Sequence, residues 1–247
     1  MNNNMQKTRV LIYTEDVLKA AEKYNNTKIP KAYPEGLYKA IAESFPNDRY
    51  IVNETGLWNI HDTITAEILA ETDVLIWWGH SQHDKVPDDI VELVVEAVQK
   101  GMGLIALHSS HVAKPFMRLV GTSCTLGWCD LDRERLWVTA PYHPIARNVP
   151  SYLDLPEEEL YAEPFDVPPP EDTVFIGWFA SGNVFRSGLT YRRGYGRIFY
   201  FQPGHEEYPI YYNDTIRLIL RNAVDWAIPE IRRDELNCPN ITESLEK

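Results

Sequence analysis

The sequence has few cysteines and no long apolar run, and each shortage excludes a class of protein. Its three cysteines, Cys124, Cys129 and Cys238, form no C-x-x-C pair. An odd number of thiols in a chain of 247 residues is typical of a reduced, cytoplasmic protein and not of a disulfide framework. No apolar run approaches the roughly 18 residues of a membrane span, and the first ten residues, MNNNMQKTRV, lack the apolar core of a signal peptide. We therefore expect a cytoplasmic protein that does not enter a membrane.

The chain also has fewer basic than acidic residues. Lys and Arg number 24 against 36 Asp and Glu, which gives a formal net charge of −12. A field of that sign repels phosphate backbones and anionic lipid headgroups, so nucleic acids and membrane surfaces are excluded as partners. Hydrophobic residues make up 44% of the chain and aromatic residues 12%, which is enough to build a full core. We expect a globular protein whose partner is a small molecule.

Short apolar runs alternate with helix-period segments, a pattern that predicts parallel strands joined by helices. The clearest unit is a strand over 73–78, a helix over 88–100 and a strand over 103–107. We expect residues 1–247 to form one α/β domain, with a core at about 9–227, a β-rich insertion before the last strand and a polar tail over 231–247. Other predicted strands cover 9–13, 50–55, 134–140, 159–165, 184–191 and 196–201, and other predicted helices cover 34–45 and 213–227.

Histidines follow three of these strands. Five of the seven lie at strand ends, namely His80 and His83, His108 and His111, and His205. In an open parallel sheet, ligands bind beyond the carboxyl ends of the strands, where neighbouring loops converge. The sequence therefore predicts one shared polar site built largely of imidazoles.

Neutral imidazole is the commonest metal ligand, and three histidines with one open position can activate water or polarise a carbonyl on zinc. The H-E-x-x-H motif is absent, so the hypothesis depends on the fold and not on local spacing. We expect a divalent metal, Zn, bound by His80, His108, His205 and Glu163. Glu163 is equally well interpreted as an exposed acid on an edge strand. Residues expected to contact substrate are His83, His111, Trp78 and Tyr161, although the aromatic members fit a packed core as well as a sugar-binding cleft.

Six strings of residues stand out along the chain: WWGH at 77–80, GMGLI at 101–105, LHS at 107–109, ERLWV at 134–138, VFRSG at 184–188 and GRIFYFQPGHE at 196–206. Their order and content resemble the signature blocks of ThuA-like trehalose-utilisation proteins. More loosely, they resemble class I glutamine amidotransferases, which have a nucleophile elbow where His108 stands and a His-x-Glu pair near His205. The resemblance implies a three-layer, flavodoxin-like fold with a mainly parallel sheet. It also implies action on trehalose-type disaccharides or their keto derivatives, beside an NAD-dependent sugar oxidoreductase.

The departure from the amidotransferase pattern bears directly on the chemistry. His108 stands at the elbow and Ser109 follows it, so no thiolate is available and glutaminase activity is not expected. Three hypotheses stay open. The first is a metal or acid–base site in a sugar-metabolising isomerase, lyase or hydrolase, with His108, Ser109, His205 and Glu206 as catalytic candidates. The second is a serine hydrolase using Ser109, His205 and Glu206, although the glycines of G-x-S-x-G are missing. The third is a non-catalytic sugar-binding or partner protein. A homo-oligomer is expected in each case.

Overall fold

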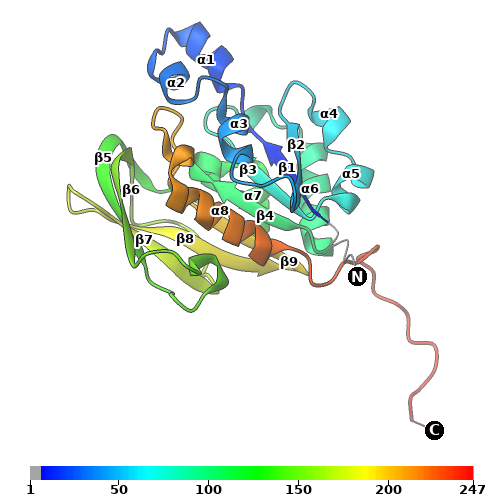
Figure 1. Ribbon diagram of the computed structural model, residues 1–247. Helices are drawn as coiled ribbons and strands as arrows, with labels where there is room; N and C mark the ends of the chain where they lie inside the picture. The colour runs from blue at the N-terminus through cyan, green and yellow to red at the C-terminus, as the bar shows by residue number, and fades with distance from the viewer. Residues whose placement is uncertain (1–6, 247) are drawn as a thin grey trace.

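Nine strands form one continuous sheet in the computed structural model, which describes residues 7–246 (Figure 1). Residues 1–6 and 247, which include most of the segment inspected for a signal peptide, lie outside the described residues. The strand order is β2-β1-β3-β4-β9-β8-β7-β5-β6. The strands are β1 (Thr8–Tyr13), β2 (Tyr50–Thr55), β3 (Val74–Trp78), β4 (Gly103–Leu107), β5 (Gly127–Val138), β6 (Tyr152–Ala162), β7 (Asp172–Phe179), β8 (Val184–Arg193) and β9 (Gly196–Phe201).

The first five strands of that order are all parallel to their neighbours, as in a flavodoxin-like sheet. Every residue of β3 and β4 is buried, which is why both strands are continuously apolar and easy to predict from sequence. The predicted α/β fold is confirmed. Because β3, β4 and β9 lie side by side and run the same way, their carboxyl ends open at one edge of the sheet.

The β-rich insertion extends the same sheet beyond β9. It adds four antiparallel contacts between strands to the four parallel ones. The strand predicted over 134–140 is the second half of a longer β5, and the strand predicted over 159–165 is the end of a β6 that starts earlier. The starts of β5 and β6 are not predictable from the apolar pattern. The first half of β5 is exposed, so its backbone pairing with β6 defines it as a strand.

Helices cover both faces of the sheet and make three layers (Figure 1). Alternate residues of β1 show the division, since Val10 and Ile12 pack with α8 on one face while Leu11 and Tyr13 pack with α6 on the other. No helix within residues 7–246 is long and apolar enough to cross a bilayer. The helices are α1 (Val17–Tyr24), α2 (Lys28–Ala32), α3 (Leu37–Ala42), α4 (Ile60–Thr63), α5 (Ala66–Glu71), α6 (Asp88–Lys100), α7 (Lys114–Val120) and α8 (Asp214–Ala227).

Candidate metal centre

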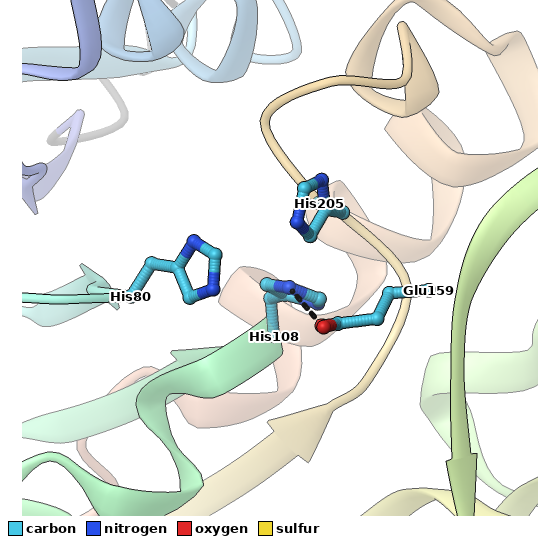
Figure 2. Close-up of side chains that lie close together, drawn as sticks. All are labelled: His80, His108, Glu159 and His205. Carbon is cyan, nitrogen blue, oxygen red and sulfur yellow. Dashed lines mark ion pairs between the residues drawn. The ribbon is translucent and has the colours of Figure 1, made fainter. Parts of the chain in front are cut away.

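Three histidines meet where β3, β4 and β9 end (Figure 2). The ring centroids of His80 and His108 are 5.7 Å apart, those of His80 and His205 5.0 Å, and those of His108 and His205 5.2 Å. With Glu159 they form a cluster in which one potential ligand atom from each residue lies within 4.8 Å of the others. The structure therefore brings together the three histidines named from the sequence, with a carboxylate that sequence reasoning missed.

Glu159 and His108 face each other in a buried setting. Glu159 Oε2 lies 3.1 Å from His108 Nε2, and the two side chains are 6% and 0% exposed. Among the described residues neither atom has another hydrogen-bond partner, and the two form an ion pair when His108 is protonated (Figure 2). The other ring nitrogen, Nδ1, lies 3.0 Å from the carbonyl oxygen of Gln202 and donates to it. A neutral His108 therefore directs a lone pair toward a carboxylate, an arrangement that a cation between them would stabilise.

Glu206 forms a second buried contact at the cluster. Its Oε1 lies 2.7 Å from His80 Nδ1, while its Oε2 lies 3.7 Å from His205 Nε2. Burial raises the pKa of the Glu206 carboxyl, but pairing with His80 outweighs burial and holds this pKa at about 2. Burial lowers the pKa of His80, and Glu206 more than compensates, so the net shift is upward. The sequence, in which Glu206 directly follows His205, predicts that Glu206 orients His205. The hydrogen bond of Glu206 is made to His80 instead.

Burial keeps the imidazoles of His205 and His111 neutral. It lowers the pKa of His205 to about 4 and that of His111 to about 4. His111 Nδ1 donates to the Cys124 carbonyl oxygen at 2.7 Å, so the lone pair of a neutral His111 is on Nε2. Cys124 is itself buried, with a pKa that burial raises to about 11, which agrees with a structural thiol.

Two buried carboxylates hold the loops that carry the histidines. Neither role could be predicted from the sequence. Glu15, after β1, accepts hydrogen bonds from the backbone N–H groups of His80, Ser81 and Gln82 at 2.9 to 3.2 Å. Glu158 accepts from the N–H groups of Gly204 at 2.8 Å and His205 at 3.2 Å. Burial raises the pKa of Glu158 to about 7. These contacts fix His80 and His205 through the backbone.

His108 occupies a sharp turn at the end of β4. Its φ is +54°, in the left-handed region that a non-glycine residue seldom adopts, and a 3-10 turn (His108–Val112) follows at once. Such a turn resembles the nucleophile elbow of the amidotransferase fold, where strained backbone presents one side chain at the strand end. Here the side chain presented is an imidazole.

A pocket of about 300 Å³ opens beside the cluster. Trp128, on its rim, is 65% exposed, while Tyr161 is buried in its wall. The pocket is therefore lined by groups suited to an uncharged, partly apolar molecule, with Glu159 as its charged member. Its lining residues are His80, Ser109, His111, Val112, Thr125, Leu126, Trp128, Glu159 and Tyr161.

The structure corrects the assignment of Glu163 as a ligand. Glu163 pairs with Arg186, whose Nε and Nη2 donate to its two oxygens at 2.7 and 2.9 Å. This bidentate pair satisfies the carboxylate outside the histidine cluster, so Glu159, four residues earlier, is the acid that faces the imidazoles. The Ser109–His205–Glu206 arrangement is also not assembled, because the Ser109 hydroxyl is hydrogen-bonded to the Tyr161 hydroxyl at 2.7 Å.

Two residues expected to contact substrate lie behind the site. Trp78 is 0% exposed, stacks parallel to His108 and donates its indole N–H to the Gly204 carbonyl oxygen at 3.0 Å. It therefore supports the cluster and cannot touch a substrate. His83 packs against Gly79 on the side of Glu15 and does not line the pocket, whereas His111 and Tyr161 do.

The sheet order and the helices on both of its faces define a mixed α/β protein with a class I glutamine amidotransferase-like fold. The chain belongs to the ThuA family, described as trehalose utilisation, whose model matches residues 9–227. No curated protein matches the sequence.

Solved structures support the same fold. A ThuA-like protein from Parabacteroides merdae is 15% identical, with a TM-score of 0.66 over 94% of this chain and 93% of that one. Another from Bacteroides uniformis is 16% identical, with a TM-score of 0.62 over 92% and 94% of the two chains. The PurLQS structure from Thermotoga maritima is 11% identical, with a TM-score of 0.52 over 90% of this chain and 99% of the matched chain. At these identities the likeness concerns the fold alone.

Proposed function

We propose that the protein is a metal-dependent enzyme of disaccharide catabolism that acts on a keto-sugar, with a divalent ion, Zn²⁺, at the cluster of His80, His108, His205 and Glu159. Membership of the trehalose-utilisation family supports the substrate class. The pocket beside the cluster is at the small end of the range for small-molecule sites, which suits a single sugar ring with its apolar face on Trp128. Within the described residues its lining has no lysine or arginine, which favours a neutral sugar over a phosphorylated one.

The observation that carries the proposal is the pair of His108 Nε2 and Glu159 Oε2. Both atoms are buried, lack hydrogen-bond partners among the described residues and lie 3.1 Å apart. A buried carboxylate is costly unless it is paired, and either a proton on His108 Nε2 or a cation between the two atoms would pair it. Zn²⁺ is bound at about 2.0–2.2 Å by imidazole nitrogen and carboxylate oxygen, the donor types that converge here. Bond lengths of this size place the donor atoms of a tetrahedral site about 3.4 Å apart, so the 4.8 Å span of the cluster would need to contract by about 1.4 Å on binding.

The chemistry follows from what the pocket presents. A bound divalent ion would polarise a carbonyl or hydroxyl oxygen of the sugar, or lower the pKa of a water. His111 lines the pocket and, when neutral, has its lone pair on Nε2, so it is placed to accept a proton from the carbon next to the polarised carbonyl. Loss of that proton allows isomerisation or elimination of a keto-disaccharide. Water activation at the same place would give hydrolysis.

Metal analysis tests the proposal directly. We expect the full-length chain, purified without chelator, to hold about one divalent ion, and chelation to abolish turnover of a 3-keto-disaccharide until Zn²⁺ is restored. Glu159→Gln should lose the metal. Glu163→Gln is the matched control, because it removes a carboxylate that pairs with Arg186 outside the cluster, and it should keep the metal. Metal-free protein with full turnover would contradict the proposal, and sugar binding without turnover under any metal condition would favour a non-catalytic binding protein.

The setting of the reaction belongs to the same proposal. A keto group on a disaccharide forms by oxidation of a hydroxyl. An NAD-dependent sugar oxidoreductase would therefore supply the keto-disaccharide to this protein or reduce its product. Cys129 and Cys238 are exposed free thiols, which supports a cytoplasmic location. Homo-oligomerisation stays a prediction that the mass in solution would check.

A further inference from the structure

The hydrogen bonds of the cluster determine which ring nitrogen of each histidine carries the proton. His108 Nδ1 faces the carbonyl oxygen of Gln202 and His80 Nδ1 faces the carboxylate of Glu206, at 3.0 and 2.7 Å. Both partners accept hydrogen bonds and cannot donate them, so in each neutral ring the proton is on Nδ1. The lone pair of each is then on Nε2. This is the arrangement of metal-bound histidines, whose other N–H is held by a carbonyl or a carboxylate.

His205 has the opposite arrangement. The backbone N–H of Glu207 donates to His205 Nδ1 at 3.1 Å, and a backbone amide can only donate. The lone pair of Nδ1 is therefore in use, and the neutral ring carries its proton on Nε2. That nitrogen lies 3.7 Å from Glu206 Oε2, a carboxylate oxygen that favours an N–H over a lone pair. Neither nitrogen of a neutral His205 has a free lone pair for a metal.

The position of His205 is fixed from both sides. Its own N–H and that of Gly204 donate to the buried carboxylate of Glu158, and the Gly204 carbonyl oxygen accepts the indole N–H of Trp78. A rotation of the ring that exchanged its nitrogens would lose the bond from Glu207. The loop thus holds the Nε2–H of His205 near the rings of His80 and His108, with centroids 5.0 and 5.2 Å away.

We infer that the metal ligands are His80, His108 and Glu159, and that His205 is a fixed hydrogen-bond donor to an oxygen of the bound sugar. The inference rests on the proposed function. Two histidines and one acid leave a coordination position open, as catalytic zinc sites require. A preorganised N–H beside that position stabilises negative charge as it develops on a carbonyl oxygen. His205 is then a substrate-contacting group that is separate from the ligand set.

The tautomers can be measured on the full-length chain with its metal removed by a chelator. Long-range ¹H–¹⁵N spectra of protein labelled with ¹⁵N-histidine distinguish a ring nitrogen that carries a proton from one that does not. Single variants assign the signals, because each removes one histidine. At a pH above the raised pKa of His80, where the rings are neutral, we expect His205 to be protonated at Nε2, and His80 and His108 at Nδ1. A proton on Nδ1 of His205 would overturn the inference.

Zn²⁺ binding supplies a second readout. His80→Ala and His108→Ala should weaken Zn²⁺ affinity by more than about 100-fold, beyond the 10–100-fold that loss of an outer partner causes. His205→Ala should stay within about tenfold of the wild type. His205→Gln, which restores an N–H donor, should recover turnover that His205→Ala loses, at the same metal content. Loss of metal in His205→Ala equal to that in His80→Ala would overturn the inference. A wild-type chain that binds no Zn²⁺ contradicts the proposed function instead, and the spectra alone then decide the tautomer.

Discussion

Glu134 is a buried acid that the proposed chemistry does not use. It is fully buried in the insertion, with one oxygen accepting the Ser187 hydroxyl at 3.0 Å and the other lacking a partner among the described residues. Burial, and secondarily the nearby Glu158, raise the pKa of Glu134 well above its ordinary value. The side chain is thus protonated in the folded protein over a pH range where it is ionised in the unfolded chain.

This shift has a defined effect on stability. A carboxyl whose pKa is raised by folding contributes its stability fully below its unfolded pKa of about 4.3, and loses that contribution as pH rises toward its folded pKa. Glu134→Gln removes the titration. We expect the metal-free variant to gain stability relative to the wild type as pH rises from 5 to 8. Denaturant unfolding at the two pH values measures this, and parallel pH profiles would contradict it.

His108 and Ser109 are neighbours with different expected importance. His108→Ala should remove most turnover, by roughly 100-fold or more, while Ser109→Ala should stay within about tenfold, because the serine hydroxyl is paired with Tyr161 and not with a base. His61→Ala, at a side chain that is 64% exposed and outside the histidine cluster, serves as the control. Steady-state rates on a keto-disaccharide compare the three. A Ser109→Ala variant as inactive as His108→Ala would restore the serine hydrolase hypothesis.

The loop after β3 depends on an element that is remote in sequence. Glu15 accepts hydrogen bonds from three successive backbone N–H groups of that loop, including that of His80, and so orients His80 through its backbone and not through its ring. Glu15→Ala should weaken Zn²⁺ affinity by about 10–100-fold, the usual effect of losing an outer partner. Its neighbour Asp16 caps α1 by accepting from Lys19 N–H, and Asp16→Ala should cost about 1 kcal/mol of stability while leaving Zn²⁺ affinity unchanged. Equal Zn²⁺ affinity in both variants would show that Glu15 does not position His80.

Elements with a strong apolar pattern could be predicted from the sequence to within a few residues, because burial alone defines them. The predicted helix over 88–100 and strand over 103–107 match α6 and β4. The sequence does not predict α1, α2, α4, α5 and α7, since short helices with one buried side leave a weak periodic pattern. The sequence also does not predict β7. This strand follows a proline-rich loop, and its buried and exposed residues alternate imperfectly.

The histidines of the site were predictable, whereas its carboxylate was not. Each histidine follows a buried parallel strand, so strand order alone brings them together. Glu159 belongs to β6, the edge strand furthest from β2, and the sheet order does not place it near β4. The end of β6 pairs with the first half of β5, which has no partner on β7 among the described residues, and there the Gln202 side chain donates to the Glu159 carbonyl oxygen at 3.0 Å and holds Glu159 beside the end of β9. In the run PEEEL of β6, no periodicity separates the three acids.

At the scale of the whole molecule, an amidotransferase-like fold should not be accompanied by amidotransferase activity. The turn that presents a cysteine thiolate in that class presents His108, which cannot form a thioester with the glutamine side chain. We therefore expect no release of ammonia from glutamine above the uncatalysed rate, with or without Zn²⁺. His108→Cys would test whether the turn alone suffices, and activity in the wild type would show that the elbow has been misassigned.

Strand β9 joins the two halves of the sheet, parallel to β4 on one side and antiparallel to β8 on the other. Residues 108–195 are synthesised after β4, its parallel partner, and before β9 itself. A nascent chain that ends at β8 therefore leaves the edge of β4 unpaired, which is a site for aberrant strand pairing. It also lacks His205, so the cluster is completed only after the last strand emerges. Folding should accordingly be late and slow, governed by contacts between distant segments.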